Sequence, residues 1–192
     1  MTQPKLQITS EEYLAAERKA EHRHEYYNGE IFAMAGASRT HNRIVSNLMV
    51  GFGSKIKGGR CEIYANDLRV RIEEMRSFVY PDIVITCGDE EYLDDEFDTL
   101  LNPVVIIEVL SESTAQHDMT TKFSAYRRIP SLQEYLMVAQ ERVKIEHFAR
   151  QTEELWTYRA YEELGLTIRL ESVGVELSVE DVYAKVNFEI EE

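Results

Sequence analysis

Two nearly continuous apolar runs constrain the fold of this chain more than any other feature of its sequence. They are "VYPDIVITC" at residues 79–87 and "PVVIIEVL" at residues 103–110. Both are short and bounded by turn residues, which is typical of central strands covered on both faces. Glu108 interrupts the second run. An ionised carboxylate in an apolar interior costs several kcal/mol unless another group pairs with it, so this position needs a partner.

The segments around these strands carry helix, turn and strand signals. Thr9 and Glu12 form a capping box that predicts a helix. Asn28-Gly29 predicts the turn of a hairpin. Ser38 precedes an apolar stripe at three- and four-residue spacing, which predicts a long helix. Asp118 is predicted to begin a short helix, and further strands are predicted at residues 61–72, 132–139, 142–150, 154–160 and 166–172, with a last helix at 178–186.

These signals predict a mixed α/β fold of the α+β kind. A central mixed sheet is flanked by helices and followed by an antiparallel extension over residues 141–192. A chain of 192 residues is expected to form one domain.

The charge balance points in two directions. The net charge of −14 argues against a protein that binds nucleic acid, because phosphate contacts dominate such binding. Residues 38–76, however, carry eight basic against four acidic residues. This segment forms either a locally basic face on an acidic body or ordinary solvated helix and strand edges.

Composition also bears on where the protein acts. No apolar run approaches the ~20 residues of a membrane span, and no basic start with an apolar block marks a secretory signal. Cys61 and Cys87 lie far apart in predicted strands, and we expect them to be buried, reduced thiols. Together these features predict a cytoplasmic protein without a membrane segment.

Three residues in the central part of the chain suggest a chemistry. Asp82 opens one central strand, Glu108 lies near the end of the next, and Lys122 lies on the following helix. Carboxylates that neighbouring strands bring together repel each other, and a shared cation relieves the repulsion. Hard oxygen ligands without a cysteine or histidine cluster favour Mg²⁺ or Mn²⁺ over zinc. A lysine beside such a metal can orient an attacking water and stabilise a phosphate, which suits phosphodiester hydrolysis.

The same residues carry a resemblance to a known family. The order "YPDIVI", "NPVVIIEVLSEST", His117-Asp118, Lys122 and Tyr126 resembles the Uma restriction-endonuclease family of the PD-(D/E)XK nuclease superfamily. The upstream "HEYYNGEIFAMAGASRTHNRI" is similar to the same family, and the resemblance covers roughly residues 10–140. It implies a restriction-endonuclease-like core, DNA as the substrate, Mg²⁺ or Mn²⁺ as the cofactor, and a homodimer.

The resemblance also implies roles for individual residues. Asp82 and Glu108 would bind the metal, with the carbonyl of Val109 as a further ligand. Lys122 would position the attacking water. Two upstream residues would assist: Glu30 as an additional acid near the metal, and His41 facing the site or the DNA.

One position departs from the superfamily pattern. The simple signature places a lysine two residues after the acid, on the same strand face, and this chain has Leu110 there. The family is understood to supply the lysine from the following helix, which fits Lys122. Leu110 and the net charge favour an alternative, a non-catalytic DNA- or protein-binding module that keeps the fold. A third reading is an acidic interaction protein with a buried Glu108–Lys122 pair, in which Asp82→Ala would be nearly silent.

Overall fold

The computed structural model describes residues 8–34, 36–110 and 122–188. The helices are α1 (Ser10–Glu17), α2 (Arg39–Ile56), the 3-10 helix η1 (Glu73–Met75), α4 (Phe123–Tyr126) and α5 (Val179–Val182). The strands are β1 (His24–Tyr27), β2 (Glu30–Ala33), β3 (Cys61–Ala65), β4 (Arg69–Ile72), β5 (Ser77–Val79), β6 (Ile83–Cys87), β7 (Thr99–Leu100), β8 (Val105–Leu110), β9 (Glu134–Ala139), β10 (Ile145–Arg150), β11 (Trp156–Tyr161), β12 (Thr167–Leu170) and β13 (Val175–Ser178). The helix start predicted at Asp118 lies outside the described residues.

The strands form a mixed sheet with two smaller sheets beside it. The six-stranded sheet has the order β11-β10-β9-β8-β6-β3, in which β8 and β9 are parallel and the other neighbours antiparallel. The five-stranded sheet has the order β2-β1-β5-β4-β7, and β12 pairs with β13. The predicted α+β class with a mixed central sheet is therefore confirmed. Within the described residues, no helix is long and apolar enough to cross a membrane.

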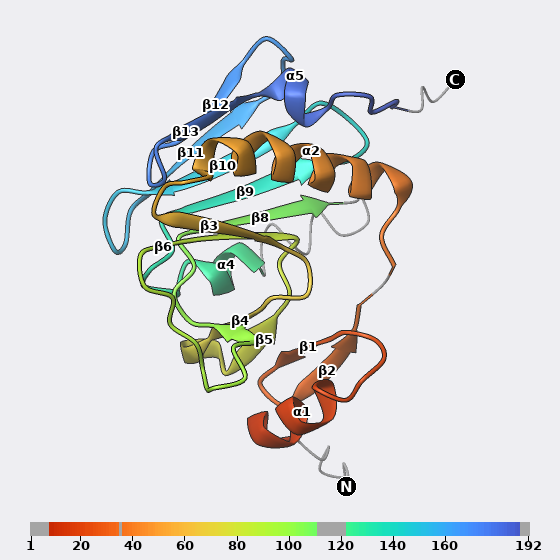
Figure 1. Ribbon diagram of the computed structural model, residues 1–192, viewed down its shortest axis with the longest axis vertical. Coiled ribbons are helices and arrows are strands. Elements are labelled where there is room, and N and C mark those ends of the chain that lie inside the picture. The colour runs from red at the N-terminus through yellow and green to blue at the C-terminus, as the bar shows by residue number, and fades with distance from the viewer. Residues whose placement is uncertain (1–7, 35, 111–121, 189–192) are drawn as a thin grey trace, which may run out of the picture.

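The six-stranded sheet has two different faces. The long helix α2 covers one of them, whereas α4 and strands β4 and β5 lie against the other (Figure 1). Residues of β8 alternate between these faces, because successive side chains of a strand point to opposite sides. Val105, Ile107 and Val109 pack in the core on the α2 side, and Ile106 and Leu110 pack on the α4 side. Glu108 therefore points towards α4.

Two strands that the sequence predicted as continuous are each broken, and this corrects the prediction. Residues 61–72 form β3 and β4, separated by Asn66 and Asp67, both in the left-handed conformation (φ 44° and 49°). Residues 77–87 form β5 and β6, separated at Pro81, which has no N–H for a strand ladder. In both cases one half belongs to the five-stranded sheet and the other to the six-stranded sheet.

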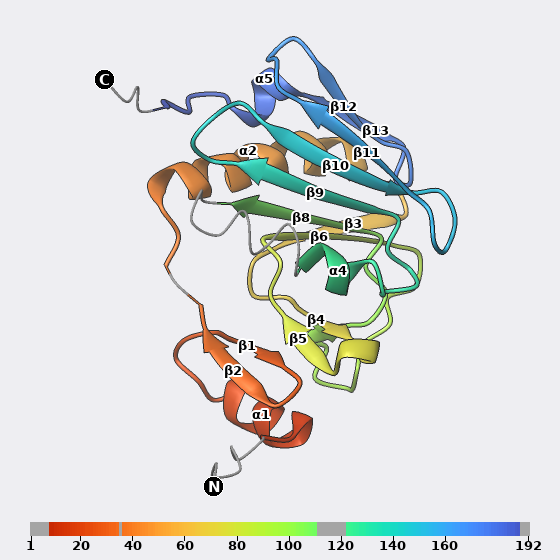
Figure 2. The ribbon, with the colours of Figure 1, turned by 180° about the vertical axis from the view of Figure 1, so that it is seen from behind.

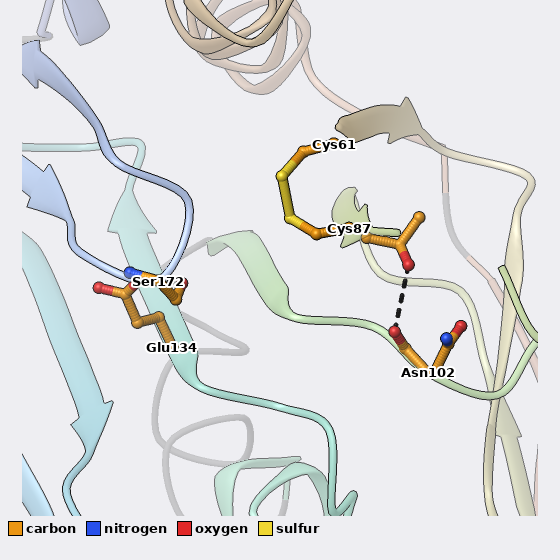
Figure 3. Close-up of a disulfide and its surroundings, with 6 residues drawn as sticks. Cys61, Cys87, Asn102, Glu134 and Ser172 are labelled. Carbon is orange, nitrogen blue, oxygen red and sulfur yellow. Dashed lines mark hydrogen bonds between the residues drawn. A yellow bond between two sulfur atoms is a disulfide. The ribbon is translucent and has the colours of Figure 1, made fainter. Parts of the chain in front are cut away.

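The two cysteines are joined, so the prediction of reduced thiols is wrong. Strands β3 and β6 are antiparallel, and their register places Cys61 directly opposite Cys87. The two residues form a disulfide with Cα atoms 3.9 Å apart, shown beside Asn102 in Figure 3. Distance in sequence concealed a direct strand pairing, and the joined cysteines no longer indicate a reducing compartment.

The N-terminal elements are fastened to the rest of the fold by buried polar contacts. The predicted capping box of α1 is present, with Thr9 and Glu12 bonded reciprocally. The buried Glu17 accepts hydrogen bonds from the His24 N–H (2.9 Å) and the Tyr80 hydroxyl (3.2 Å). These contacts hold the β1–β2 hairpin against β5, with which β1 pairs. The hairpin projects below the larger sheet in Figure 2.

Candidate active site

Asp82 and Glu108 face each other where β6 meets β8. The antiparallel register pairs Ile83 with Ile107, and continuing it by one residue places Asp82 opposite Glu108. The Val109 N–H donates a hydrogen bond of 2.8 Å to Oδ2 of Asp82. The main chain of Val109, whose carbonyl is predicted as a metal ligand, therefore lies beside the same carboxylate.

Glu108 is bonded by two side chains from the α4 segment. Nζ of Lys122 lies 3.2 Å from Oε1 of Glu108, and the Tyr126 hydroxyl donates to the same oxygen at 2.7 Å. Lys122 and Tyr126 are four residues apart, so on a helix they lie on one face. The predicted lysine therefore does reach the acid from the following helix.

The environment of Glu108 disfavours its ionised form. Only 3 % of its surface is exposed. Burial raises the pKa of Glu108; Lys122 and the Tyr126 hydroxyl act to lower it, and the negative charge of Asp82 raises it further. The net shift is upward. Two neighbouring acids, one of them buried, are a donor set that a divalent cation would stabilise.

His41 joins this site from the first turn of α2. Its backbone N–H donates a hydrogen bond to the hydroxyl of the N-cap residue Ser38. Its Nε2 lies 3.1 Å from Oδ1 of Asp82. Burial acts to lower the pKa of His41, but the hydrogen bond and the charge of Asp82 outweigh burial, so the pKa is raised. Both oxygens of Asp82 thus have hydrogen-bonding neighbours, and its orientation is fixed from two elements.

The hairpin β1–β2 contributes acids to the same region. Glu30 is exposed at the start of β2 and pairs with Tyr27, so it shares a face with Tyr27 and Glu25. Glu25 accepts hydrogen bonds from the Tyr27 hydroxyl (3.0 Å) and the Tyr80 N–H (3.3 Å). The charge of Glu25 also contributes to the raised pKa of Glu108. Glu25 therefore faces the carboxylate pair from the other sheet.

Sequence reasoning selected Glu30 and missed Glu25 and Tyr126. Residues at alternate positions of a strand share a face, so the pattern "EYYNGE" already placed both glutamates on one side of the hairpin. Tyr126 belongs to the pattern of the resemblance and lies four residues after Lys122, but the sequence alone does not assign it the hydrogen bond to Glu108.

The arrangement suits a cation that is held partly by the main chain and water. Among the described residues, no group of three or more histidine, cysteine or acidic side chains is placed to hold a metal ion. Mg²⁺ usually keeps several waters and takes only one or two carboxylates from the protein. Asp82 and Glu108, with the Val109 carbonyl, are a donor set of this kind.

The fold defines the class of protein. A solved structure titled as a putative nuclease belonging to DUF820, from Anabaena variabilis, superposes with a TM-score of 0.75 at 19% sequence identity. The match covers 92% of this chain and 98% of the other. The chain therefore shares the fold of that solved structure.

The family follows from sequence comparison. The profile of the Uma2 family, described as "Putative restriction endonuclease", matches residues 10–180. Two Synechocystis sp. relatives are similar: "Uncharacterized protein slr1290" is 32% identical over 96% of both chains, and "Uncharacterized protein sll1609" is 38% identical over 78% of this chain and 84% of its own. The chain belongs to the Uma2 family, as the resemblance implied.

Proposed function

We propose that the protein is a DNA endonuclease that hydrolyses phosphodiester bonds with the help of Mg²⁺ or Mn²⁺. The observation that carries this proposal is the position of Glu108, buried opposite Asp82 with its pKa raised. A carboxylate whose ionised form remains disfavoured, although a lysine and a tyrosine pair with it, is typical of a site that holds a cation or transfers a proton. Family membership supports the choice of nucleic acid as the substrate.

Each residue of the site has a role in this proposal. Asp82 and Glu108 would hold the metal with the carbonyl of Val109, and the bound metal would polarise the scissile phosphate and lower the pKa of a water. Lys122 would orient the attacking water and stabilise charge on the phosphate. Tyr126 fixes the Glu108 carboxylate through its hydrogen bond.

Three further residues would act around the metal. His41 orients Asp82 from α2 and would face the substrate. Glu25 would be an additional acid that takes up a proton or binds a water, because its charge already raises the pKa of Glu108. Glu30 shares the face of Glu25 and would lie at the entrance, because it is exposed.

The test is nicking of supercoiled plasmid by the purified protein with Mg²⁺, with Mn²⁺ and with chelator. Loss of a residue that only supports a metal ligand usually costs roughly 10- to 100-fold in activity. Asp82→Asn removes a proposed ligand itself, so it is expected to lower nicking by more than that. Asp95→Asn, an exposed acid in the loop before β7, is the matched control and should leave nicking unchanged. Calorimetric titration of Mn²⁺ should show binding to the wild type and to Asp95→Asn, and none to Asp82→Asn.

The non-catalytic binding module is the competing function. Folded wild-type protein that binds DNA, binds no Mn²⁺ and leaves the plasmid intact under every metal condition would favour that module and reject the nuclease. Metal binding that survives Asp82→Asn would reject the proposed donor set.

We also propose that two copies of the chain associate through β2. Four of the ten exposed large hydrophobic residues in the described part of the chain lie on or beside this strand: Ile8, Ile31, Phe32 and Met34. Strand β2 is one of the two edge strands of the five-stranded sheet and contains neither lysine nor proline, the residues that usually protect an edge from pairing. A second copy related by a two-fold axis could pair with it antiparallel and bring a second site for the second DNA strand.

The oligomeric state tests this surface directly. Sedimentation equilibrium should give a dimer for the wild type and a monomer for Ile31→Lys. Leu164→Lys changes an exposed apolar residue elsewhere and should remain dimeric. A monomeric wild type, or a dimer that persists in Ile31→Lys, would reject the β2 interface.

A further inference from the structure

A pocket of about 840 Å³ opens next to α4. Its walls include Arg127 and Arg128, which follow α4, and Glu153, Glu154 and Trp156 from the β10–β11 hairpin. Its volume falls in the range of small-molecule sites, roughly 300–1,000 Å³. Guanidinium groups, carboxylates and an indole ring therefore surround one space that the proposed chemistry does not use.

The short helix α4 connects this pocket to the candidate active site. Lys122 and Tyr126 contact Glu108. Phe123 follows Lys122, and Arg127 follows Tyr126. Phe123 and Arg127 therefore lie together about 100° further around the helix. Phe123 packs against Trp156 in an edge-to-face contact of 5.5 Å, and Arg127 lines the pocket. The α4 segment therefore contributes residues both to the contacts of Glu108 and to the wall of the pocket.

Trp156 is held in place before any ligand binds. The Arg150 guanidinium lies 4.5 Å from the centre of the indole ring. Arg150 is itself fixed, because it donates to the backbone carbonyls of Leu132 (2.6 Å), Arg127 (2.8 Å) and Ile129 (2.8 Å). The pocket therefore has a rigid aromatic wall, which lowers the entropic cost of binding a planar group.

The charges of the pocket differ in how far they are already engaged. Arg128 donates to Glu74 at 2.8 Å, and Arg150 is committed to carbonyls and to Trp156. Arg127 is exposed and, within the described residues, takes part in no ion pair. Its guanidinium is thus the cation best placed to meet an incoming anion such as a phosphate.

We propose that this pocket binds an unpaired nucleotide of the nucleic acid strand that occupies the active site. The base would stack against Trp156, the phosphate would pair with Arg127, and N–H groups of the base would donate to Glu153 or Glu154. Aromatic stacking with a nearby cation is the usual chemistry of single-strand recognition. This inference rests on the proposed function, since it assigns the form of substrate that the same site would accept.

The experiment uses the intrinsic fluorescence of Trp156, which is the single tryptophan of the chain. Full-length protein is titrated with a five-nucleotide oligothymidylate in the presence of chelator, so that no strand is cut. The expected result is saturable quenching, with affinity lowered about tenfold in Arg127→Ala by loss of a charge-assisted contact. A blunt-ended DNA duplex that is long enough to stay paired, added at the same nucleotide concentration, should quench much less.

Arg159→Ala is the matched control. Arg159 is an exposed arginine of the same strand, but it lies three residues from Trp156 and so on the opposite face, over the Tyr161 ring. It should bind as the wild type does. Equal losses in Arg127→Ala and Arg159→Ala, equal quenching by the duplex, or no change in fluorescence would each overturn the pocket assignment.

Failure of this inference is distinguishable from failure of the proposed function. Metal-dependent nicking that needs Asp82, together with unchanged Trp156 fluorescence, would leave the nuclease standing and reject the pocket. Quenching that is sensitive to Arg127, with no nicking under any metal condition, would leave the pocket standing and reject the nuclease.

Discussion

Two buried glutamates on neighbouring parallel strands have opposite surroundings. Glu108 of β8 is 3% exposed and Glu134 of β9 is 2% exposed. Glu134 lies on the same side of the sheet as Leu136, towards α2, whereas Glu108 points towards α4. Glu134 accepts hydrogen bonds from His147 (3.1 Å), the Glu171 N–H (3.2 Å) and the Ser172 N–H (3.1 Å). It also accepts one from the Ser172 hydroxyl (Figure 3).

A buried acid by itself is therefore weak evidence of an active site. The contacts of Glu134 in the described part of the chain are with hydrogen-bond donors, two of them backbone N–H groups. Glu108 faces two donors and also the negative charge of Asp82, which raises its pKa. The donors around Glu134 stabilise it without a further group, whereas a cation would stabilise Glu108 beside Asp82.

The largest expected effect comes from removing the satisfied glutamate. Glu134→Ala leaves His147 and two backbone N–H groups without their acceptor, and we expect a loss of about 3–5 kcal/mol in the free energy of unfolding. Urea unfolding measures it. Glu176→Ala is the control, because the Glu176–Arg169 pair is exposed and should be worth at most about 1 kcal/mol. Similar losses in the two variants would remove the contrast.

Replacing Glu108, in contrast, should raise the free energy of unfolding at high pH. Because the pKa of Glu108 is raised in the folded state, the folded protein binds this proton more tightly than the unfolded chain. Stability should therefore fall as pH rises from the ordinary glutamate pKa, near 4.5, through the raised value. In chelator, Glu108→Gln should lack this fall and exceed the wild type by roughly 1–3 kcal/mol at pH 8. Identical pH slopes in urea unfolding would contradict this prediction.

The smallest effect concerns the hydroxyl that supports Glu108. Tyr126→Phe removes a donor to the ionised carboxylate, so it should destabilise the protein by about 1 kcal/mol at pH 8 and by less at pH 5. Tyr158→Phe removes an exposed tyrosine–glutamate hydrogen bond and serves as the matched control. The prediction fails if Tyr126→Phe costs the same at both pH values in urea unfolding.

The sequence predicted most elements of the fold because their signals are local. The capping box at Thr9, the turn at Asn28-Gly29 and the cap at Ser38 each depend on residues within a few positions. It did not predict where the chain leaves one sheet for another, since an apolar run looks the same on both sides of Pro81. The pairing of Cys61 with Cys87 depended on the same long-range register.

The candidate site was predictable in part for similar reasons. Asp82, Glu108 and Lys122 stand out because charges in or beside buried strands need partners. Glu25 did not stand out, because it lies in an alternating strand where a glutamate is ordinary. Its approach to Glu108 depends on how the five-stranded sheet packs on the larger one, and no local pattern encodes that packing.

The parallel pairing of β8 with β9 also has a consequence during synthesis. Strands β3, β6 and β8 are made before β9, so β8 can pair with β6 and still present its other edge to solvent. All six of its residues are buried in the finished protein, and an apolar open edge of that kind favours association between incomplete chains. Strands β9, β10 and β11 then follow as a meander of short connections, which closes quickly once it emerges. The nascent chain is therefore most vulnerable to aggregation in the interval between the release of β8 and the arrival of β9.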